Sequence, residues 1–262
     1  MVGEARRILV TGATGGIGTA ICRQLAGSGY SLVLAARDEA KLKALSDDVT
    51  GNGHMWLRLD MTSDQSIRQF AEELAAKHIA LDGAVLMPPQ AHSTNDPMPS
   101  SEAWRALFQN CFIGPLEVLK VVAIDRMSSD PINGRRAKIV IISGISSAQV
   151  LGHYATSNVL RCAWIGEAKT LAFALGARGI HVNTLSLGGT LSPWYREGIE
   201  KRAEAAGITF EERLAEETSN IPLGKYGEPA EVAVAVEGLL SPFSDHMTGL
   251  NIMHDGGFTR SY

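Results

Sequence analysis

The chain has 262 residues, 45% hydrophobic residues and a formal net charge of −4 at pH 7. It is long enough to bury a full hydrophobic core, as one large α/β domain or as two small ones. The acidic balance excludes the basic surface that nucleic-acid binding requires.

No segment approaches the ~20 consecutive apolar residues of a membrane span. The apolar run near the N-terminus, in residues 1–7, is too short for a signal peptide. Three cysteines, Cys22, Cys111 and Cys162, are far apart in apolar, helical surroundings. We therefore expect buried free thiols in a reducing compartment and a cytoplasmic protein.

Apolar runs typical of β-strands alternate with helical stretches. The predicted strands are 8–11, 31–36, 54–59, 81–87, 138–143, 180–186 and 250–253. The predicted helices are 17–27, 39–49, 63–78, 101–128, 154–177 and 228–240. Several strands are apolar at nearly every position, as in a parallel sheet covered on both faces. The pattern predicts an α/β fold, a single Rossmann-like, doubly wound parallel sheet of about seven strands with helices on both faces.

Two segments interrupt this alternation. One is the proline-rich loop 88–100, and the other is an insertion, 187–227, in which we expect two short helices. Both follow strands, so both are expected to lie over the site as lids or substrate walls. The insertion's Trp194, Tyr195 and Phe210 suit either an apolar ligand or a small core of its own. No linker separates a second domain, so we expect residues 1–262 to form one domain.

A glycine-rich stretch follows the first predicted strand, and a helical pattern begins directly after it. Glycines let the backbone approach phosphate oxygens, and free N–H groups of a first helical turn point at negative charge. Such a loop alone would also fit an ordinary tight turn, but the strand before it and the helix after it favour a diphosphate site. The residues assigned to this site are Gly12, Thr14, Gly15, Gly16, Ile17 and Gly18.

The spacing Thr-Gly-x-x-x-Gly-Ile-Gly resembles that of the short-chain dehydrogenase/reductases, and the resemblance covers nearly the whole chain. After the second strand, Ala36 stands where NAD-binding members carry an acid, and Arg37 follows it. A guanidinium pairs with a 2′-phosphate, so the resemblance implies NADP(H) rather than NAD(H). The alternative for Arg37 is a solvated arginine at a helix start. The second basic residue of the family, inside the glycine loop, is replaced by Gly15.

The same resemblance implies further cofactor contacts. Asp60 and the backbone of Met61 match the adenine-binding turn after the third strand, although Asp60 would also serve the turn alone. Gly188 and Ser192 match the segment beside the nicotinamide. In that segment Leu187 replaces a proline and Ser192 replaces a threonine.

The catalytic residues that the resemblance implies are altered in this chain. Asn110 fits the family's Asn-x-x-x-Gly helix position, and its alternative is a structural, water-binding amide. Tyr154 opens a predicted helix, but Asn158 stands where the family has the lysine that lowers the tyrosine's pKa. The family's serine position falls nearest Gly144, and the hydroxyl of Ser143 beside it is either a donor or the end of the strand. The gap from this strand to Tyr154 is about three residues shorter than usual.

Arg161 offers a replacement for the missing lysine charge. Tyr154, Asn158 and Arg161 fall on one stripe of a helix. The guanidinium would lend charge to the tyrosine or to a substrate carboxylate, but it would not shuttle protons. Its alternative is a salt-bridged helix arginine. The segment 157–161 resembles the Ser-Asn-x-x-Arg of a divergent branch of the family, which includes an ene reductase that lacks the usual tyrosine and lysine.

Three functions fit these residues. The first is an NADP(H)-dependent oxidoreductase that transfers hydride to a carbonyl or an activated C=C bond of a small substrate. The second is a non-redox lyase or isomerase on the same scaffold, and the third is a nucleotide-binding pseudoenzyme that serves as a partner subunit. Because Asn110, Tyr154 and Gly188 still frame a nicotinamide site, we favour the first. The resemblance implies a homo-oligomer, a dimer or tetramer, and we expect no nucleic-acid, membrane or metal partner.

Overall fold

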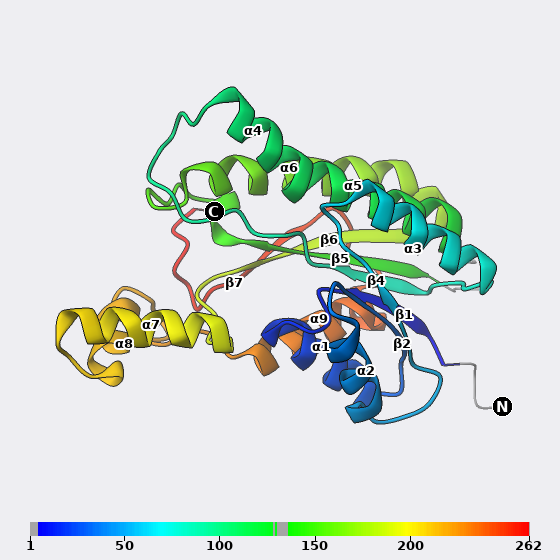
Figure 1. Cartoon of the computed structure of the whole chain (residues 1–262), viewed down its shortest axis with the longest axis horizontal. Helices are drawn as coiled ribbons and strands as arrows, with labels where there is room; N and C mark the ends of the chain where they lie inside the picture. The colour runs from blue at the N-terminus through cyan, green and yellow to red at the C-terminus, as the bar shows by residue number, and fades with distance from the viewer. Residues whose placement is uncertain (1–4, 128, 130–135, 262) are drawn as a thin grey trace.

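The computed structural model describes residues 5–127, 129 and 136–261, and it confirms the predicted fold class (Figure 1). Seven strands form one sheet in the order β3-β2-β1-β4-β5-β6-β7, and every pair is parallel. The strands are β1 (Arg7–Thr11), β2 (Ser31–Ala36), β3 (Met55–Arg58), β4 (Gly83–Leu86), β5 (Ala137–Gly144), β6 (Ile180–Leu187) and β7 (Asn251–His254). From β1 the chain adds strands first on one side, β2 and β3, and then on the other side, β4 to β7. This change of side between β1 and β4 places a ligand crevice at their carboxyl ends.

Helices cover both faces of the sheet, as the strands that are apolar at nearly every position predict. Two hydrophobic cores, one on each face, fill the space between helices and sheet. The helices of the first face are α3 (Asp64–Ala76), α5 (Gly114–Lys120) and α6 (Ala155–Leu175). The helices of the second face are α1 (Gly16–Gly27), α2 (Glu39–Asp48) and α9 (Pro229–Leu240). Figure 1 shows the first set above the sheet and the second set below it.

The predicted helix 101–128 is one long helical segment that contains two π-helical turns. α4 (Ser101–Phe108) continues through the turn Gln109–Ile113 into α5, and a second π turn spans Val121–Arg126. Residue 128 lies outside the described residues. The stretch Ser101–Ala123 is long and apolar enough to cross a membrane, which the sequence analysis did not anticipate. Its Val118, Leu119 and Val122 are buried in the core of the first face, so packing inside the protein accounts for its composition.

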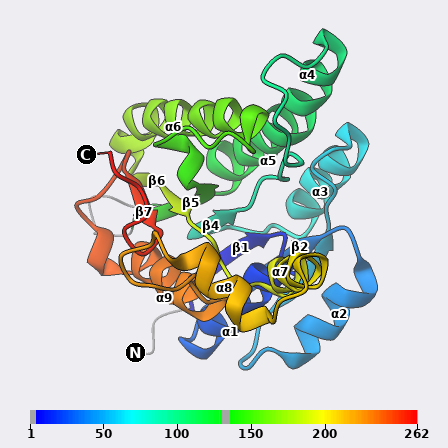
Figure 2. The same ribbon diagram turned by 90° about the vertical axis from the view of Figure 1, so that its left-hand side faces the viewer.

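The insertion contains two helices, as predicted. α7 (Pro193–Ala206) and α8 (Phe210–Thr218) pack against each other and lie beside the start of α1 (Figure 2). The Glu217 carboxylate accepts hydrogen bonds from Arg202 and from Arg213, each at 2.8 Å. Burial alone would raise the pKa of Glu217, but these two arginines hold it below its ordinary value. Trp194 is 77% exposed, so it does not belong to a core of the insertion.

The cysteine expectation is confirmed at two positions and wrong at the third. Cys22 and Cys111 are buried free thiols, and burial raises the pKa of Cys22 to about 12. Cys162 is a free thiol on the exposed face of α6. Residues 1–4 of the N-terminal segment lie outside the described residues.

Candidate active site

The glycine-rich loop joins β1 to α1 at the carboxyl edge of the sheet. Gly12 has a φ of +61°, a conformation that favours glycine. A Cβ on Gly18 would lie 2.2 Å from the Gly12 carbonyl oxygen, so α1 approaches the loop at backbone contact. Gly15 is the N-cap of α1 and supplies no side-chain cap, which leaves the first turn open to an anion. The other predicted loop residues, Thr14, Gly16 and Ile17, are half-buried or exposed.

The start of the insertion lies against this loop. A Cβ on Gly16 would come within 2.5 Å of Pro193 Cδ and 3.2 Å of Ser192 Cβ. Ser192 is the N-cap of α7, and its hydroxyl accepts a hydrogen bond from the Tyr195 N–H at 3.4 Å. Gly188 permits close packing, because its Cβ would lie 2.8 Å from Asp255 Cβ. Ser192 therefore lies beside the glycine loop, whereas its contact with a nicotinamide, and that of Gly188, stay predictions.

Two arginines stand beside Asp60 at the ends of β2 and β3. Arg37 follows β2, and Arg58 ends β3, where it pairs in register with Ala36. Both arginines are exposed, and neither forms an ion pair within the described part of the chain. Burial alone would raise the pKa of Asp60, but hydrogen bonds from Thr62 and the charges of both arginines hold it below its ordinary value.

Sequence reasoning missed Arg58. Arg58 could have been recognised as a basic residue near the end of a strand that pairs with β2. That pairing is visible only once the strand order is known. Asp60 does serve its own turn, since its Oδ1 accepts hydrogen bonds from the Thr62 N–H at 3.0 Å and the Thr62 hydroxyl at 2.7 Å. The contacts of Asp60 and Met61 with an adenine stay predictions.

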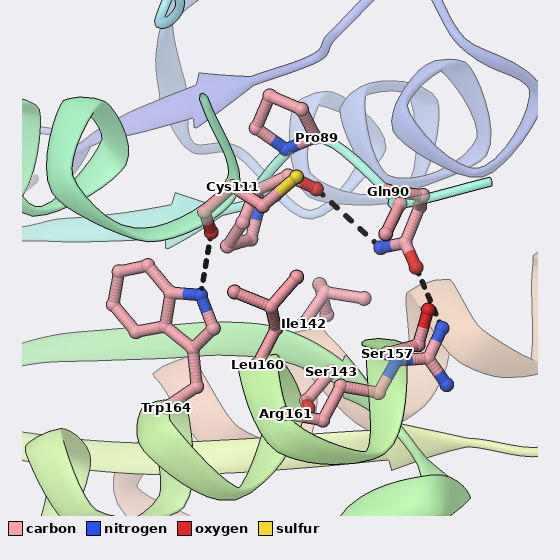
Figure 3. Close-up of a pocket in the computed structure, with 11 residues that line it drawn as sticks. Pro89, Gln90, Cys111, Ile142, Ser143, Ser157, Leu160, Arg161 and Trp164 are labelled. Atoms are coloured by element: carbon pink, nitrogen blue, oxygen red, sulfur yellow. Dashed lines mark hydrogen bonds between the residues drawn. The ribbon is translucent and has the colours of Figure 1, made fainter. Parts of the chain in front are cut away.

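A pocket opens beyond the carboxyl ends of β4 and β5 (Figure 3). The space that it surrounds, including the part open to solvent, is about 310 Å³. The loop after β4 lines it with Pro88, Pro89 and Gln90, as expected for the proline-rich loop. The insertion contributes none of the described lining residues. The opposite wall comes from β5 and from α6, whose Arg161 points toward Gln90 (Figure 3).

Arg161 is held in this pocket by neutral groups. Its Nη2 donates to Gln90 Oε1 at 2.6 Å and its Nη1 to Ser146 Oγ at 3.4 Å. Its guanidinium carbon lies 5.7 Å from the centroid of the Tyr154 ring. No carboxylate of the described residues forms an ion pair with it, so the alternative of a salt-bridged helix arginine is wrong. Burial lowers the pKa of Arg161, yet an arginine stays charged at neutral pH.

Gly144 leaves the space that this guanidinium occupies. A Cβ on Gly144 would lie 1.7 Å from Arg161 Nη1. The glycine has φ −150° and ψ 161°, which any residue adopts, so its contribution is the missing side chain and not an unusual backbone. The guanidinium of Arg161 therefore occupies the space beside Gly144, where the resemblance places the side chain of the family's serine.

Two serines line the pocket together with Arg161. Ser143 is 6% exposed, and its buried Oγ has no hydrogen-bond partner among the described residues. Ser157 is 3% exposed and lies one helical turn before Arg161. A shift of about three residues along α6, nearly one turn, would close the short gap before Tyr154 and bring Ser157 and Arg161 in place of Tyr154 and Asn158. The sequence analysis missed Ser157 because it fixed the alignment on Tyr154, although the short gap was the signal.

Tyr154 and Asn158 lie at the start of α6 and contact the loop that precedes it. Tyr154 is the N-cap of α6 and forms a β-bridge with Thr94. Asn158 donates from Nδ2 to the Leu151 carbonyl oxygen at 3.1 Å and accepts from the Leu151 N–H at 3.3 Å. Neither Tyr154 nor Asn158 lines the pocket. The predicted stripe therefore brings Arg161 over the Tyr154 ring, whereas the Asn158 amide is engaged with loop backbone.

Asn110 lies in the π turn Gln109–Ile113, and its neighbour Cys111 lines the pocket. Such widened turns are frequent at functional sites. The helix packs closely on the turn after β3, because a Cβ on Gly114 would lie 1.9 Å from the Met61 carbonyl oxygen. This packing explains the glycine of the Asn-x-x-x-Gly match, and the catalytic role of Asn110 stays a prediction. No cluster of three metal-binding side chains occurs in residues 5–127, 129 and 136–261.

Comparisons with known proteins agree with this fold. The family model described as enoyl-(acyl carrier protein) reductase matches residues 12–259. The chain is 28% identical over 262 residues to L-fucose dehydrogenase of Mus musculus, covering 97% of this chain and 89% of that protein. It is 28% identical over 261 residues to 3-oxoacyl-[acyl-carrier-protein] reductase FabG of Escherichia coli K12, covering 97% of each.

Solved structures share the whole fold. A short-chain oxidoreductase of Pseudomonas aeruginosa PAO1, described as containing an atypical catalytic center, is 25% identical with a TM-score of 0.85 over 98% of both chains. L-sorbose reductase of Gluconobacter frateurii has the same fold, with a TM-score of 0.85 at 20% identity over 99% of this chain and 98% of that one. The fold and these relatives define an oxidoreductase built on a Rossmann-like sheet. The chain belongs to the short-chain dehydrogenase/reductase family.

Proposed function

We propose that this protein is an NADP(H)-dependent reductase that transfers hydride to a carbonyl or an activated C=C bond of a small substrate. The observation that carries the proposal is the guanidinium of Arg161, which lies in a pocket at the carboxyl edge of the sheet without a carboxylate partner in the described chain. A cation placed this way stabilises negative charge that develops on a substrate during reaction.

The residues at the crevice fit a dinucleotide. Gly18 lies in contact with Gly12, and the start of α1 has no side-chain cap. Larger side chains at these glycines would fill the space that a diphosphate needs. Arg37 and Arg58 provide two unpaired guanidinium groups for a 2′-phosphate, and Asp60 and Met61 would bind the adenine. The P. aeruginosa relative, 25% identical, has also been described as NADPH-bound, with a TM-score of 0.81. When bound, the cofactor supplies the hydride.

The residues that line the pocket have different proposed roles in the reaction of the substrate. Ser143 and Ser157 offer hydroxyl groups for the reacting oxygen, and the charge of Arg161 stabilises the anionic form of the substrate. Arg161 stays protonated, so the proton has another source. In carbonyl reduction the oxygen gains this proton from water, because Tyr154 lies beside Arg161 but does not line the pocket. In C=C reduction the β-carbon gains the hydride and the α-carbon takes a proton from water, which requires no tyrosine.

We also propose a cytoplasmic homo-oligomer, either a dimer or a tetramer. Two buried free thiols suit a reducing compartment. Phe173 and Val159 on α6 are large apolar side chains that are exposed in the single chain, which suits a surface between subunits.

The test is turnover of NADPH by the purified protein with a panel of small ketones and enones, followed by the loss of NADPH absorbance. We expect consumption with at least one class, and a fall of at least ~10-fold in kcat/KM for Arg161→Gln. NADPH binding without turnover of any compound would contradict the proposal and favour the pseudoenzyme. Substrate conversion without NADPH consumption would favour the lyase or isomerase.

A further inference from the structure

We infer that the pocket beside Arg161 binds a carboxylate, so that the substrates are small oxo acids or unsaturated acids with an apolar body. The reaction named here rests on the proposed function, whereas carboxylate binding is argued from the pocket itself.

The charge of the pocket is unbalanced. Among the described residues that line it, Arg161 is the only charged one. Its two hydrogen-bond partners, Gln90 and Ser146, are neutral. A partly buried charge without a counter-ion is unfavourable, and an anionic ligand offsets that cost when it binds.

The donors around this charge suit a planar anion. A guanidinium has five N–H donors in a fixed fork, of which Gln90 and Ser146 accept only two. Arginine forks commonly hold both oxygens of a carboxylate. Ser143 lines the same pocket, and its buried Oγ has no partner in the described chain. The pocket is therefore lined by a hydroxyl without a hydrogen-bond partner in the described chain and by a cation without a carboxylate partner there.

The rest of the pocket suits a small apolar body. Ile142, Leu160 and Trp164 line it with apolar surface. The indole N–H of Trp164 is already used, since it donates to the Cys111 carbonyl oxygen at 2.9 Å (Figure 3). A compact monocarboxylate fits this combination.

Titration calorimetry of the full chain with benzoate and with benzamide tests the inference, at fixed ionic strength. The two probes have nearly the same shape, and only benzoate is charged. We expect benzoate to bind at least about ten-fold more tightly than benzamide. Arg161→Gln should abolish this preference, and Arg161→Lys, which keeps the charge without the fork, should retain part of it. Arg23→Gln is the matched control, because Arg23 pairs with Asp48 on the exposed surface, and it should leave the preference intact.

Equal affinity for both probes, no binding of benzoate, or a preference that persists in Arg161→Gln would overturn the inference. NADPH binding is measured on the same samples, together with thermal unfolding to confirm that each variant is folded. No preference for benzoate in the unmodified protein, with NADPH turnover intact, would refute the carboxylate site and leave the proposed function standing. A benzoate preference in a protein that does not bind NADPH would refute the proposed function and leave the carboxylate site standing.

Discussion

Gly144→Ala is the sharpest test of the arrangement around Arg161. The added Cβ would lie 1.7 Å from Arg161 Nη1, so the guanidinium must move. The backbone at Gly144 accepts alanine without strain. The change in the free energy of unfolding should therefore come entirely from the displacement of Arg161.

The size of this effect follows from the contacts. Overpacking commonly costs about 1–3 kcal/mol, and the lower end applies here because the clashing atom is the tip of a flexible side chain. Moving the guanidinium also breaks its hydrogen bonds to Gln90 and Ser146, which contribute about 0.5–1.5 kcal/mol each. We expect Gly144→Ala to lower the free energy of unfolding by about 2–4 kcal/mol. In an Arg161→Gln background the clash disappears, and the cost should fall to about zero.

The assay is a double-mutant cycle measured by chemical denaturation. Independent sites add within about 0.3–0.5 kcal/mol, so a coupling of about 2–4 kcal/mol is resolved. Gly166→Ala on α6 is the matched control, because its Cβ meets nothing within 4 Å. It should stabilise both backgrounds equally, as alanine does in a helix. If Gly144→Ala costs the same in both backgrounds, or costs nothing with Arg161 present, the reasoning is refuted.

Three further predictions concern stability and reactivity. Asn158→Ala should lower the free energy of unfolding by about 1–2 kcal/mol, because two hydrogen bonds to Leu151 are lost. The affinity for NADPH should not change. Weaker NADPH binding at full stability would instead show that Asn158 contacts a ribose of the cofactor. The pKa of Glu217 is lowered in the fold, so its stabilisation is present above its ordinary value of 4.5 and is lost as the pH falls through the folded value. Fluorescence of Trp194 should report this loosening of the insertion, and Glu217→Gln should abolish its pH dependence; an unchanged acid transition would contradict the network. In the native protein Cys162 should react with a thiol reagent while the two buried cysteines stay protected, which mass spectrometry checks.

The sequence predicted the sheet well because strands buried on both faces are apolar at nearly every position. β2 and β5 are buried along their whole length and largely apolar, and such runs are visible without a structure. The glycine loop was equally readable, since Gly12 and Gly18 serve backbone geometry that other residues do not allow. These features depend on residues that are close together in the chain, so they can be predicted from the sequence.

The catalytic half was harder because its contacts are not local. Residues three or four apart share one face of a helix, so Tyr154 and Ser157 are both plausible matches to one family position. Only the structure shows which of them lines the pocket. The fit of Arg161 against Gly144 joins a helix to a strand end, and no pattern within either segment predicts it. Arg58 is a similar case, since its role depends on the pairing of β3 with β2.

The most direct test of the central claim is a binding titration of NADPH and NADH with the purified protein, beside Arg37→Ala and Arg58→Ala. A charge-assisted contact contributes about 1.5–3 kcal/mol, which corresponds to about 10- to 100-fold in affinity. We predict that the protein binds NADPH more tightly than NADH and that each variant loses NADPH affinity by such a factor while NADH binding is unchanged. Failure to bind either nucleotide, or equal weakening of both in the variants, would contradict the account.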